Sequence, residues 1–260
     1  MKLTILGSGT STGVPQLRCG CEVCRSTDPR DNRLRCSALL ETEGKNILID
    51  CGPDFREQIL RYHREGELDA LLLTHQHYDH VGGVDDLRPY CYDKNGPRDF
   101  PVYCTREVAH ALRRSIPYSF AKKRYPGVPT YDIHIITPFE PFRAAGVEVM
   151  PVPAMHSVAY NLQVVGFRFG PLAYLTDVKT IAPEAVEALR GVKVLVINAL
   201  RITEHPSHMS LSQALDVVRQ VNPERAYLTH ISHQLGLHKE VEPTLPAGVC
   251  LAYDGLQITV

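Results

Sequence analysis

The feature that most constrains this chain is the run His75-Gln76-His77-Tyr78-Asp79-His80, which holds three histidines and one aspartate. The preceding residues 68–74 are mostly apolar and predict a buried strand. Open α/β sheets carry their chemistry at the carboxyl ends of their strands, so this strand would deliver the ligands to one sheet edge. Imidazole nitrogen and carboxylate oxygen suit Zn, Fe and Mn. The alternative is a histidine-rich surface turn, which would require no further ligands downstream.

Three further candidate ligands follow downstream, each near the end of an apolar run. They are His156 after residues 147–152, Asp177 after 172–176 and His230 after 225–229. A lone histidine or aspartate after a strand is usually a cap or a satisfied polar residue, but three in series after the first motif indicate convergence on it. Together these residues predict a site for two neighbouring metal ions at a shared sheet edge.

On these residues the chain resembles the metallo-β-lactamase-fold hydrolases, and among them the PhnP phosphodiesterase family and the related tRNA 3′-processing endonucleases. The resemblance also includes the turn at 7–10, the strand end at 48–52 and residues 253–256. It implies the α/β class and a four-layer αββα sandwich, the metallo-β-lactamase or tRNase Z-like fold. It also implies two divalent metal ions, Zn or Mn with Fe as an alternative. One metal would be bound by His75, His77 and His156, the other by Asp79, His80 and His230, with Asp177 bridging the pair.

A second cluster is Cys19-Gly20-Cys21-Glu22-Val23-Cys24, which places three thiols on one short loop. This spacing is compatible with a tetrahedral zinc site that lacks one ligand. Free buried thiols and disulfides are the alternatives. The resemblance implies that His233, in the run Thr229-His230-Ile231-Ser232-His233, is the fourth ligand. One structural zinc would then stabilise and position the two loops.

A third motif, His205-Pro206-Ser207-His208-Met209-Ser210-Leu211, precedes an amphipathic run that predicts a helix. The resemblance implies that His208 is the general acid, with His205 as the competing candidate. The structural alternative is that His208 lies at the start of the helix beside Ser210, an N-cap residue. Asp79 would orient the nucleophile in addition to binding metal, and Asp50 is expected to hydrogen-bond a ligand histidine from behind.

Length and charge limit the remaining choices. The ligands are spread along a chain of 260 residues, so we expect a single domain over 1–260. A net charge of −1 gives no general case for nucleic acid or a membrane surface as partner. The first strand is too short for a signal peptide, no apolar run approaches membrane-spanning length, and eight cysteines without an export signal favour a reducing cytoplasm. A homodimer is left open.

A coarse secondary-structure reading predicts two runs of strands with flanking helices, as in a four-layer sandwich. Strands are expected near 2–7, 37–42, 46–51, 68–74, 100–103, 132–137, 146–152, 160–169, 172–176, 193–198, 225–229 and 249–259, and helices near 54–63, 105–114, 183–190 and 210–221. The segment at about 90–131 is rich in proline, glycine and aromatic residues and predicts an insertion or lid. Its interleaved basic and aromatic residues are suited to a phosphate, base or sugar. The alternative is a solvated loop whose aromatic side chains pack on the core.

The resemblance implies a dinuclear metal-dependent phosphodiesterase for small or cyclic phosphodiesters, such as a phosphoribosyl 1,2-cyclic phosphate or a 2′,3′-cyclic nucleotide. Hydrolysis would proceed through a metal-bridging hydroxide. A tRNA 3′-processing endonuclease shares every active-site ligand, but no helical tRNA-binding arm is apparent, so nucleic acid is disfavoured as a partner. A thioester or lactone hydrolase of the same superfamily is the other alternative, disfavoured because such enzymes lack the His208 motif and the cysteine loop.

Overall fold

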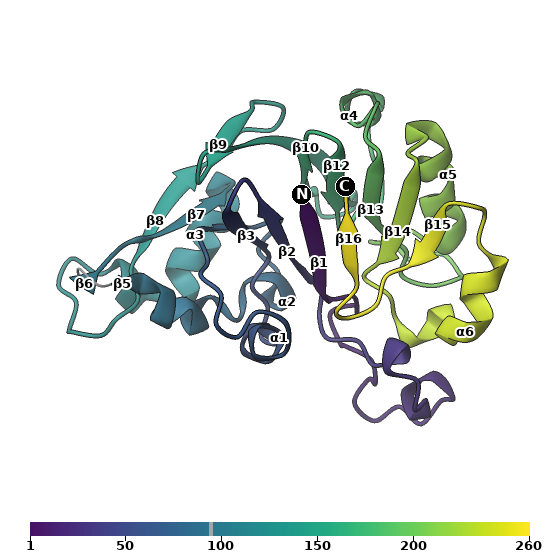
Figure 1. Ribbon diagram of the computed structural model, residues 1–260, viewed down its shortest axis with the longest axis horizontal. Coiled ribbons are helices and arrows are strands. Elements are labelled where there is room, and N and C mark those ends of the chain that lie inside the picture. Colours follow the sequence, from purple (N-terminus) through teal and green to yellow (C-terminus); the bar gives the residue numbers. More distant parts are fainter. Residues whose placement is uncertain (94–95) are drawn as a thin grey trace.

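Two seven-stranded sheets form the centre of the protein, as the computed structural model shows for residues 1–93 and 96–260 (Figure 1). The first sheet has the order β16 (Gln257–Thr259), β1 (Lys2–Gly7), β2 (Ser37–Thr42), β3 (Lys45–Ile49), β4 (Ala70–Leu72), β7 (Phe100–Cys104), β8 (Tyr131–Ile135). The second has the order β15 (Val249–Leu251), β14 (Arg225–Thr229), β13 (Val194–Asn198), β12 (Leu172–Leu175), β11 (Leu162–Phe169), β10 (Val147–Ser157), β9 (Phe142–Ala144). A small ribbon pairs β5 (Tyr92–Asp93) with β6 (Gly96–Pro97).

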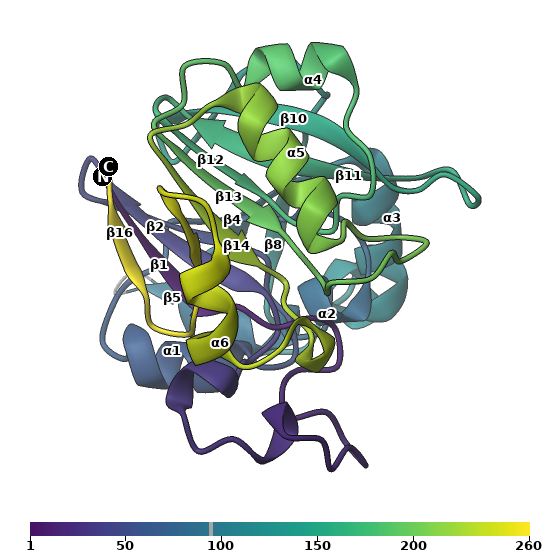
Figure 2. The same cartoon turned by 90° about the vertical axis from the view of Figure 1, so that its right-hand side faces the viewer.

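The α-helices are α1 (Phe55–Tyr62), α2 (Tyr78–Val81), α3 (Arg106–Ser115), α4 (Pro183–Ala188), α5 (Leu211–Val221) and α6 (His238–Val241). Helices α1 and α3 pack on the outer face of the first sheet, and α4, α5 and α6 on that of the second. The 3-10 helices are η1 (Val23–Arg25), η2 (Pro29–Asp31), η3 (Val84–Cys91), η4 (Pro117–Phe120), η5 (His233–Leu235) and η6 (Glu242–Thr244). Figure 2 shows α5 and α6 in front of the second sheet, with α1 and α3 on the far side of the first.

Alternation of side chains along the strands explains the layers, because neighbouring residues of a strand point to opposite faces. In the first sheet, Leu40 and Leu72 pack between the sheets, whereas Leu39 and Leu71 pack under α1 and α3. In the second sheet, Val196 faces the other sheet and its neighbours in β13 pack against α4, α5 and α6. Three buried apolar layers thus separate helices, sheet, sheet and helices, which confirms the predicted αββα sandwich.

Parallel strands bring the ends of several chain segments to one edge. β3 pairs in parallel with β4 in the first sheet, and β12, β13 and β14 are parallel neighbours in the second. Every residue of β12 and β13 is buried, as expected for parallel strands covered on both faces. Their carboxyl ends, together with the end of β10, lead into the residues that form the site described below.

The single strand predicted over 249–259 is wrong. The structure divides this region into β15 in the second sheet and β16 in the first. Asp254 lies between them and accepts hydrogen bonds from the backbone N–H groups of Ser8 and Leu34, at 2.8 and 2.7 Å. Gly255 follows with φ of +87°, a conformation that favours glycine, so the chain crosses from one sheet to the other. Strand β9 was not predicted, because its three residues carry little periodic signal.

The segment predicted as an insertion or lid, about 90–131, belongs partly to the first sheet. Strand β7 lies between β4 and β8, and α3 packs beneath it. Residues 94 and 95 lie outside the described residues. Tyr118 donates a hydrogen bond to Asp85 at 2.7 Å, and Tyr131 donates one to the carbonyl of Val84 at 2.7 Å. Both tyrosine side chains are therefore hydrogen-bonded to η3, and the insertion or lid role of the segment at about 90–131 stays a prediction.

The two ends of the chain are adjacent, at neighbouring strand ends of the first sheet (Figures 1 and 2). The Met1 ammonium group donates to the Val260 carbonyl at 3.2 Å, and the Val260 N–H donates to the Met1 carbonyl at 3.1 Å. Within residues 1–93 and 96–260, no helix combines the length and the apolar character needed to cross a bilayer.

Candidate metal centre

The structure brings all seven predicted active-site ligands together at the shared edge of the two sheets. They form two neighbouring groups, each with its ligand atoms within 4.8 Å of one another: His75, His77 and His156, and Asp79, His80, Asp177 and His230. The rings of His75 and His80, one from each group, lie 4.3 Å apart, so the two groups are in contact. The resemblance implies the same two sets of ligands for two metal ions, with Asp177, here grouped with the second set, between them.

Sharp turns after the strands position two of these side chains, Asp177 and His230, and also Asp50, which lies behind them. Asp50 follows β3 with φ of 61°, Asp177 follows β12 with φ of 60°, and His230 follows β14 with φ of 54°. Left-handed backbone at a residue other than glycine costs on the order of 1–3 kcal/mol and persists where the surroundings enforce it. His156 differs slightly from its prediction, because it lies near the end of strand β10 and not after the strand.

Asp50 is fully buried and supports one histidine from each group. Nδ1 of His80 donates a hydrogen bond to Asp50 at 2.6 Å. The Thr74 hydroxyl donates to Asp50 at 2.8 Å and accepts from Nδ1 of His75 at 3.1 Å. The predicted contact behind a ligand histidine is therefore present, and it extends through Thr74 to a second histidine.

Contacts of this kind assign the tautomers of three of the five histidines in the two groups, His75, His80 and His156. In His156, Nδ1 donates to the Ser207 carbonyl at 2.8 Å, as Nδ1 does in His75 and His80 toward their own acceptors. Because Nδ1 donates in each ring, Nε2 is directed to the centre of the site, and in the neutral ring it offers the lone pair that metal ligation requires.

Several buried nitrogens at the centre have no hydrogen-bond partner among the described residues. They include Nε2 of His75, of His80 and of His230. These atoms lie 3.1–3.9 Å from carboxylate oxygens of Asp177 without forming a hydrogen bond to them. Unsatisfied buried polar atoms cost about 1–3 kcal/mol each. Nitrogen lone pairs that converge with carboxylates fit divalent transition metals, which would satisfy all of them.

Burial and neighbouring charges shift the pKa values of Asp177 and His80 in opposite directions. Burial favours neutral Asp177, but the neighbouring His230, His80 and His75 outweigh it and hold the pKa of Asp177 well below its usual range. Burial disfavours charged His80, yet Asp177 and Asp50 raise its pKa well above the ordinary value. The pKa of His75 is lowered, chiefly by burial. The metal-free cluster is thus held by protonated His80, and metal binding would displace that proton.

His208 lies beside the candidate metal ligands, as the resemblance implies. Its ring is 4.7 Å from that of His156 and 4.8 Å from that of His230, and its Nδ1 lies 3.7 Å from Oδ1 of Asp177. Burial and the charge of His230 lower the pKa of His208 to about 2, so the ring is neutral when no anion is bound. Ser210 does cap α5, in a capping box with Gln213, so the N-cap and the position beside the ligands occur together. His205 lies farther out, with its ring 5.1 Å from that of His208.

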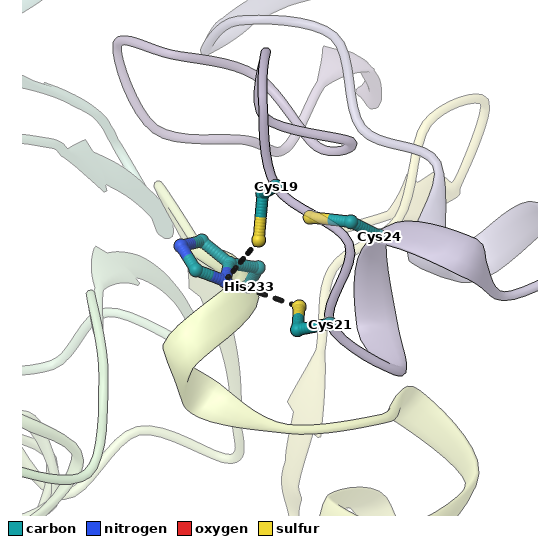
Figure 3. A group of neighbouring side chains, drawn as sticks. All are labelled: Cys19, Cys21, Cys24 and His233. Carbon is teal, nitrogen blue, oxygen red and sulfur yellow. Dashed lines mark hydrogen bonds between the residues drawn. The ribbon is translucent and has the colours of Figure 1, made fainter.

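The cysteine cluster also assembles, and Figure 3 shows His233 pointing between two of its thiols. Nδ1 of His233 lies 3.3 Å from Sγ of Cys21 and 3.6 Å from Sγ of Cys19. The Cys24 backbone and His233 contribute to lowering the pKa of Cys21 to about 6, which favours the thiolate that binds metal. All four ligand atoms lie within 4.8 Å of one another, and the cysteines are free thiols. The donor set and its geometry fit one tetrahedral zinc ion.

A cavity of about 260 Å³ opens beside His208, and the sequence did not predict it. Its walls come from the loop after β1, from residues after β13 and from the loop that carries His233. Arg201, also not predicted, is the one residue of fixed positive charge among the described residues that line it. Residues from three loops that are distant in the sequence meet at this cavity. The turn after the first strand was therefore the only sequence signal for it.

A family model described as a beta-lactamase superfamily domain matches residues 45–231. The chain belongs to this superfamily. The crystal structure of a diphosphatase from the PhnP family is 39% identical in sequence, with a TM-score of 0.90, and the match covers 100% of this chain and 97% of that one. The chain is therefore also a member of the PhnP family, which confirms the resemblance seen in the sequence. Membership makes it a metal-dependent hydrolase of the superfamily.

Two other proteins are similar to this chain, one in sequence and one in fold. A protein of Porphyromonas gingivalis named octanoyltransferase is 44% identical over 262 residues, which cover 100% of this chain and 52% of that protein. The chain thus spans about half the length of this curated relative. Zn²⁺-bound PqqB from Methylobacterium extorquens has a TM-score of 0.81 at 19% identity, with 100% of both chains covered, and this likeness shows the fold alone.

The thiol cluster yields a direct prediction. Cys21→Ser removes a low-pKa thiolate, so we expect bound zinc to fall by about one atom per chain and the melting temperature to fall by roughly 3 °C or more. Elemental analysis and thermal unfolding measure the two effects. Cys250→Ser, whose thiol belongs to no metal-binding group among the described residues, is the matched control and should retain all zinc. Full zinc content in Cys21→Ser would remove the case for this site.

Proposed function

We propose that this PhnP-family protein is a dinuclear metal-dependent phosphodiesterase that hydrolyses small or cyclic phosphodiesters. The proposed ligands are His75, His77 and His156 for one metal and Asp79, His80 and His230 for the other, with Asp177 between them. The 39% identical PhnP-family protein is named a diphosphatase, which supports phosphorus–oxygen chemistry in this family. Zn, Mn and Fe all suit this ligand set.

The position of His208 carries the proposal. It lies between the metal ligands and the cavity of about 260 Å³, touching both. An imidazole in this place can reach the leaving oxygen of an ester whose phosphorus lies over the ligands. Ring contacts to His156 and His230, at 4.7 and 4.8 Å, hold its orientation. A proton donor of this kind is needed most when the leaving group is a poorly acidic alkoxide, as in a ribose ester.

Each residue of the centre has a separate task. When bound, the metal pair would lower the pKa of a shared water and neutralise charge on the phosphoryl oxygens. Burial opposes ionisation of Asp79, but the neighbouring imidazoles of His230 and His80 hold its pKa below the ordinary value, so its carboxylate could accept a hydrogen bond from the attacking water and orient it. The phosphate charge beside His208 favours its protonated form, and the imidazole then passes that proton to the leaving oxygen. Asp50 keeps Nε2 of His80 directed at the centre throughout.

A phosphodiester suits this arrangement better than a monoester. Its phosphorus carries two unesterified oxygens, whose single negative charge the metal pair can neutralise, whereas a monoester brings additional charge and an additional oxygen. The transferase activity named for the Porphyromonas gingivalis relative stays with that protein, because this chain corresponds to 52% of its length.

The direct test compares esters on one protein sample. Metal-stripped protein is refilled singly with Zn, Mn or Fe and assayed on bis-p-nitrophenyl phosphate and on p-nitrophenyl phosphate. We expect faster turnover of the diester with at least one of the metals. Faster turnover of the monoester would contradict the proposal, and cleavage of a precursor tRNA without diester turnover would favour the endonuclease alternative.

The role of His208 has its own prediction. His208→Ala should retain both active-site metals by elemental analysis and lose about 10²–10⁴-fold in kcat on a diester with an alkyl leaving group. The loss with p-nitrophenolate should be smaller, because that leaving group needs little protonation. His110→Ala, an exposed histidine on α3, is the control. Equal losses on both leaving groups would exclude a general acid, and a larger loss in His205→Ala would transfer the role to His205.

A further inference from the structure

We infer that Cys36 is a positioning residue of the metal centre, whose buried thiol orients the Asp177 carboxylate through the hydroxyl group of Thr176. Cys36 itself belongs to no metal-binding group among the described residues. This role goes beyond the proposed function, because it requires only that Asp177 binds metal and holds whatever the substrate is. It assigns a task in the site to a cysteine that otherwise resembles an ordinary core residue.

Three hydroxyl groups of the second sheet converge on the Cys36 sulfur. Sγ of Cys36 lies 3.1 Å from the phenol oxygen of Tyr174 and 3.4 Å from Oγ1 of Thr229. Oγ1 of Thr176 lies 3.6 Å from the same sulfur. All four side chains are buried, and the hydroxyls of Tyr174 and Thr229 have no other hydrogen-bond partner within the described part of the chain. Cys36 directly precedes β2, so its thiol joins the first sheet to the ends of β12 and β14 in the second.

The number of hydrogens available sets the direction of these contacts. The Thr176 hydroxyl donates its one hydrogen to Oδ2 of Asp177 at 2.7 Å, so its oxygen is left to accept at the longer contact with Cys36. Burial raises the pKa of the Cys36 thiol, so the sulfur keeps a hydrogen to donate. The hydroxyls of Tyr174 and Thr229 then donate to the sulfur, which is a weak acceptor. A directed chain of hydrogen bonds thus runs from the core to the Asp177 carboxylate.

The Asp177 carboxylate needs such support because its two oxygens face different histidines. Oδ1 lies 3.2 Å from Nε2 of His230, and Oδ2 lies 3.1 Å from Nε2 of His80. Rotation of the carboxylate would displace both oxygens, and the hydrogen bond from Thr176 to Oδ2 opposes that rotation. Thr176 immediately precedes the left-handed turn at Asp177, so movement of Thr176 would also move this turn. The contact between Cys36 and Thr176 therefore restrains both the side chain and the backbone of the proposed bridging ligand.

The residue that follows Cys36 contacts the opposite side of the centre. Ser37 is buried, and its hydroxyl donates to the backbone carbonyl of Asp50 at 2.8 Å. The carboxylate of Asp50 in turn accepts the hydrogen bond from His80. The two neighbouring residues at the start of β2 thus contact the turn after β3 in the first sheet and the strand end after β12 in the second. This position explains how one thiol can align ligands that come from both sheets.

The test measures metal affinity, because a residue that only fills the core would change stability and leave affinity unaltered. Metal-stripped protein is titrated with Mn²⁺, with free Mn²⁺ read by electron paramagnetic resonance, and with Zn²⁺ in competition with a chelating dye. Cys36→Ala should weaken binding at the histidine and aspartate centre about 10-fold, and Cys36→Ser should retain most of the affinity, since a hydroxyl can also donate to Thr176. Cys104→Ala is the control, because it removes a buried sulfur from the layer between the first sheet and its helices. It should melt at a lower temperature yet bind metal as the wild type does.

A double-mutant cycle tests whether the effect of Cys36 passes through Thr176. Thr176→Val removes the donor to Asp177 and should weaken metal binding about 10- to 100-fold. Adding Cys36→Ala to that variant should cause little further loss, because the path is already broken. Additive losses, or wild-type affinity in Cys36→Ala, would overturn the positioning role. Cys36→Val, which fills the space of the sulfur without its hydrogen bonds, takes the place of Cys36→Ala if the latter does not fold.

These outcomes are distinct from those that test the proposed function. Wild-type protein that binds metal but hydrolyses no diester would contradict the phosphodiesterase, while the affinities of the Cys36 variants would still decide the positioning role. Wild-type protein that binds neither Mn²⁺ nor Zn²⁺ at these residues would overturn the metal centre and the role of Cys36 together.

Discussion

One buried carboxylate connects the two halves of the metal centre. Asp50 binds His80 directly at 2.6 Å and reaches His75 through the Thr74 hydroxyl, and these two histidines belong to different ligand groups. Because both histidines donate from Nδ1, both present Nε2 to the centre. Loss of such a contact typically costs about 10- to 100-fold in metal affinity. The orientation of these two histidines depends on Asp50, which is not itself a proposed metal ligand.

The site carries a cost in strain and desolvation. Asp50, Asp177 and His230 all adopt left-handed backbone at strand ends. Nε2 of His75, of His80 and of His230 are buried without hydrogen-bond partners among the described residues. Close packing of three apolar layers around the two sheets holds these turns in place. Divalent cations at the centre would convert an unfavourable group of buried charges and lone pairs into a stable one, so metal binding and local stability are expected to be linked.

Most of the fold and of the candidate metal centre could be predicted from the sequence, because most of the candidate ligands follow apolar runs whose periodicity is clear. The His75–His80 motif, the sandwich and most strands were predicted from such local patterns. His233 could not be found from spacing, since its partners lie more than 200 residues away in the chain. The cavity and Arg201 depend on three loops meeting, and the crossing at Asp254 depends on hydrogen bonds to Ser8 and Leu34. Such long-range contacts leave no periodic signal.

The most direct measurement of the central claim is anomalous X-ray diffraction from crystals of native protein purified without chelators, recorded at the Zn, Mn and Fe absorption edges. The account predicts two peaks about 3.5–4 Å apart on either side of the Asp177 carboxylate. It also predicts a separate zinc peak among Cys19, Cys21, Cys24 and His233. A single peak at the histidine and aspartate cluster, or none, would contradict a dinuclear centre.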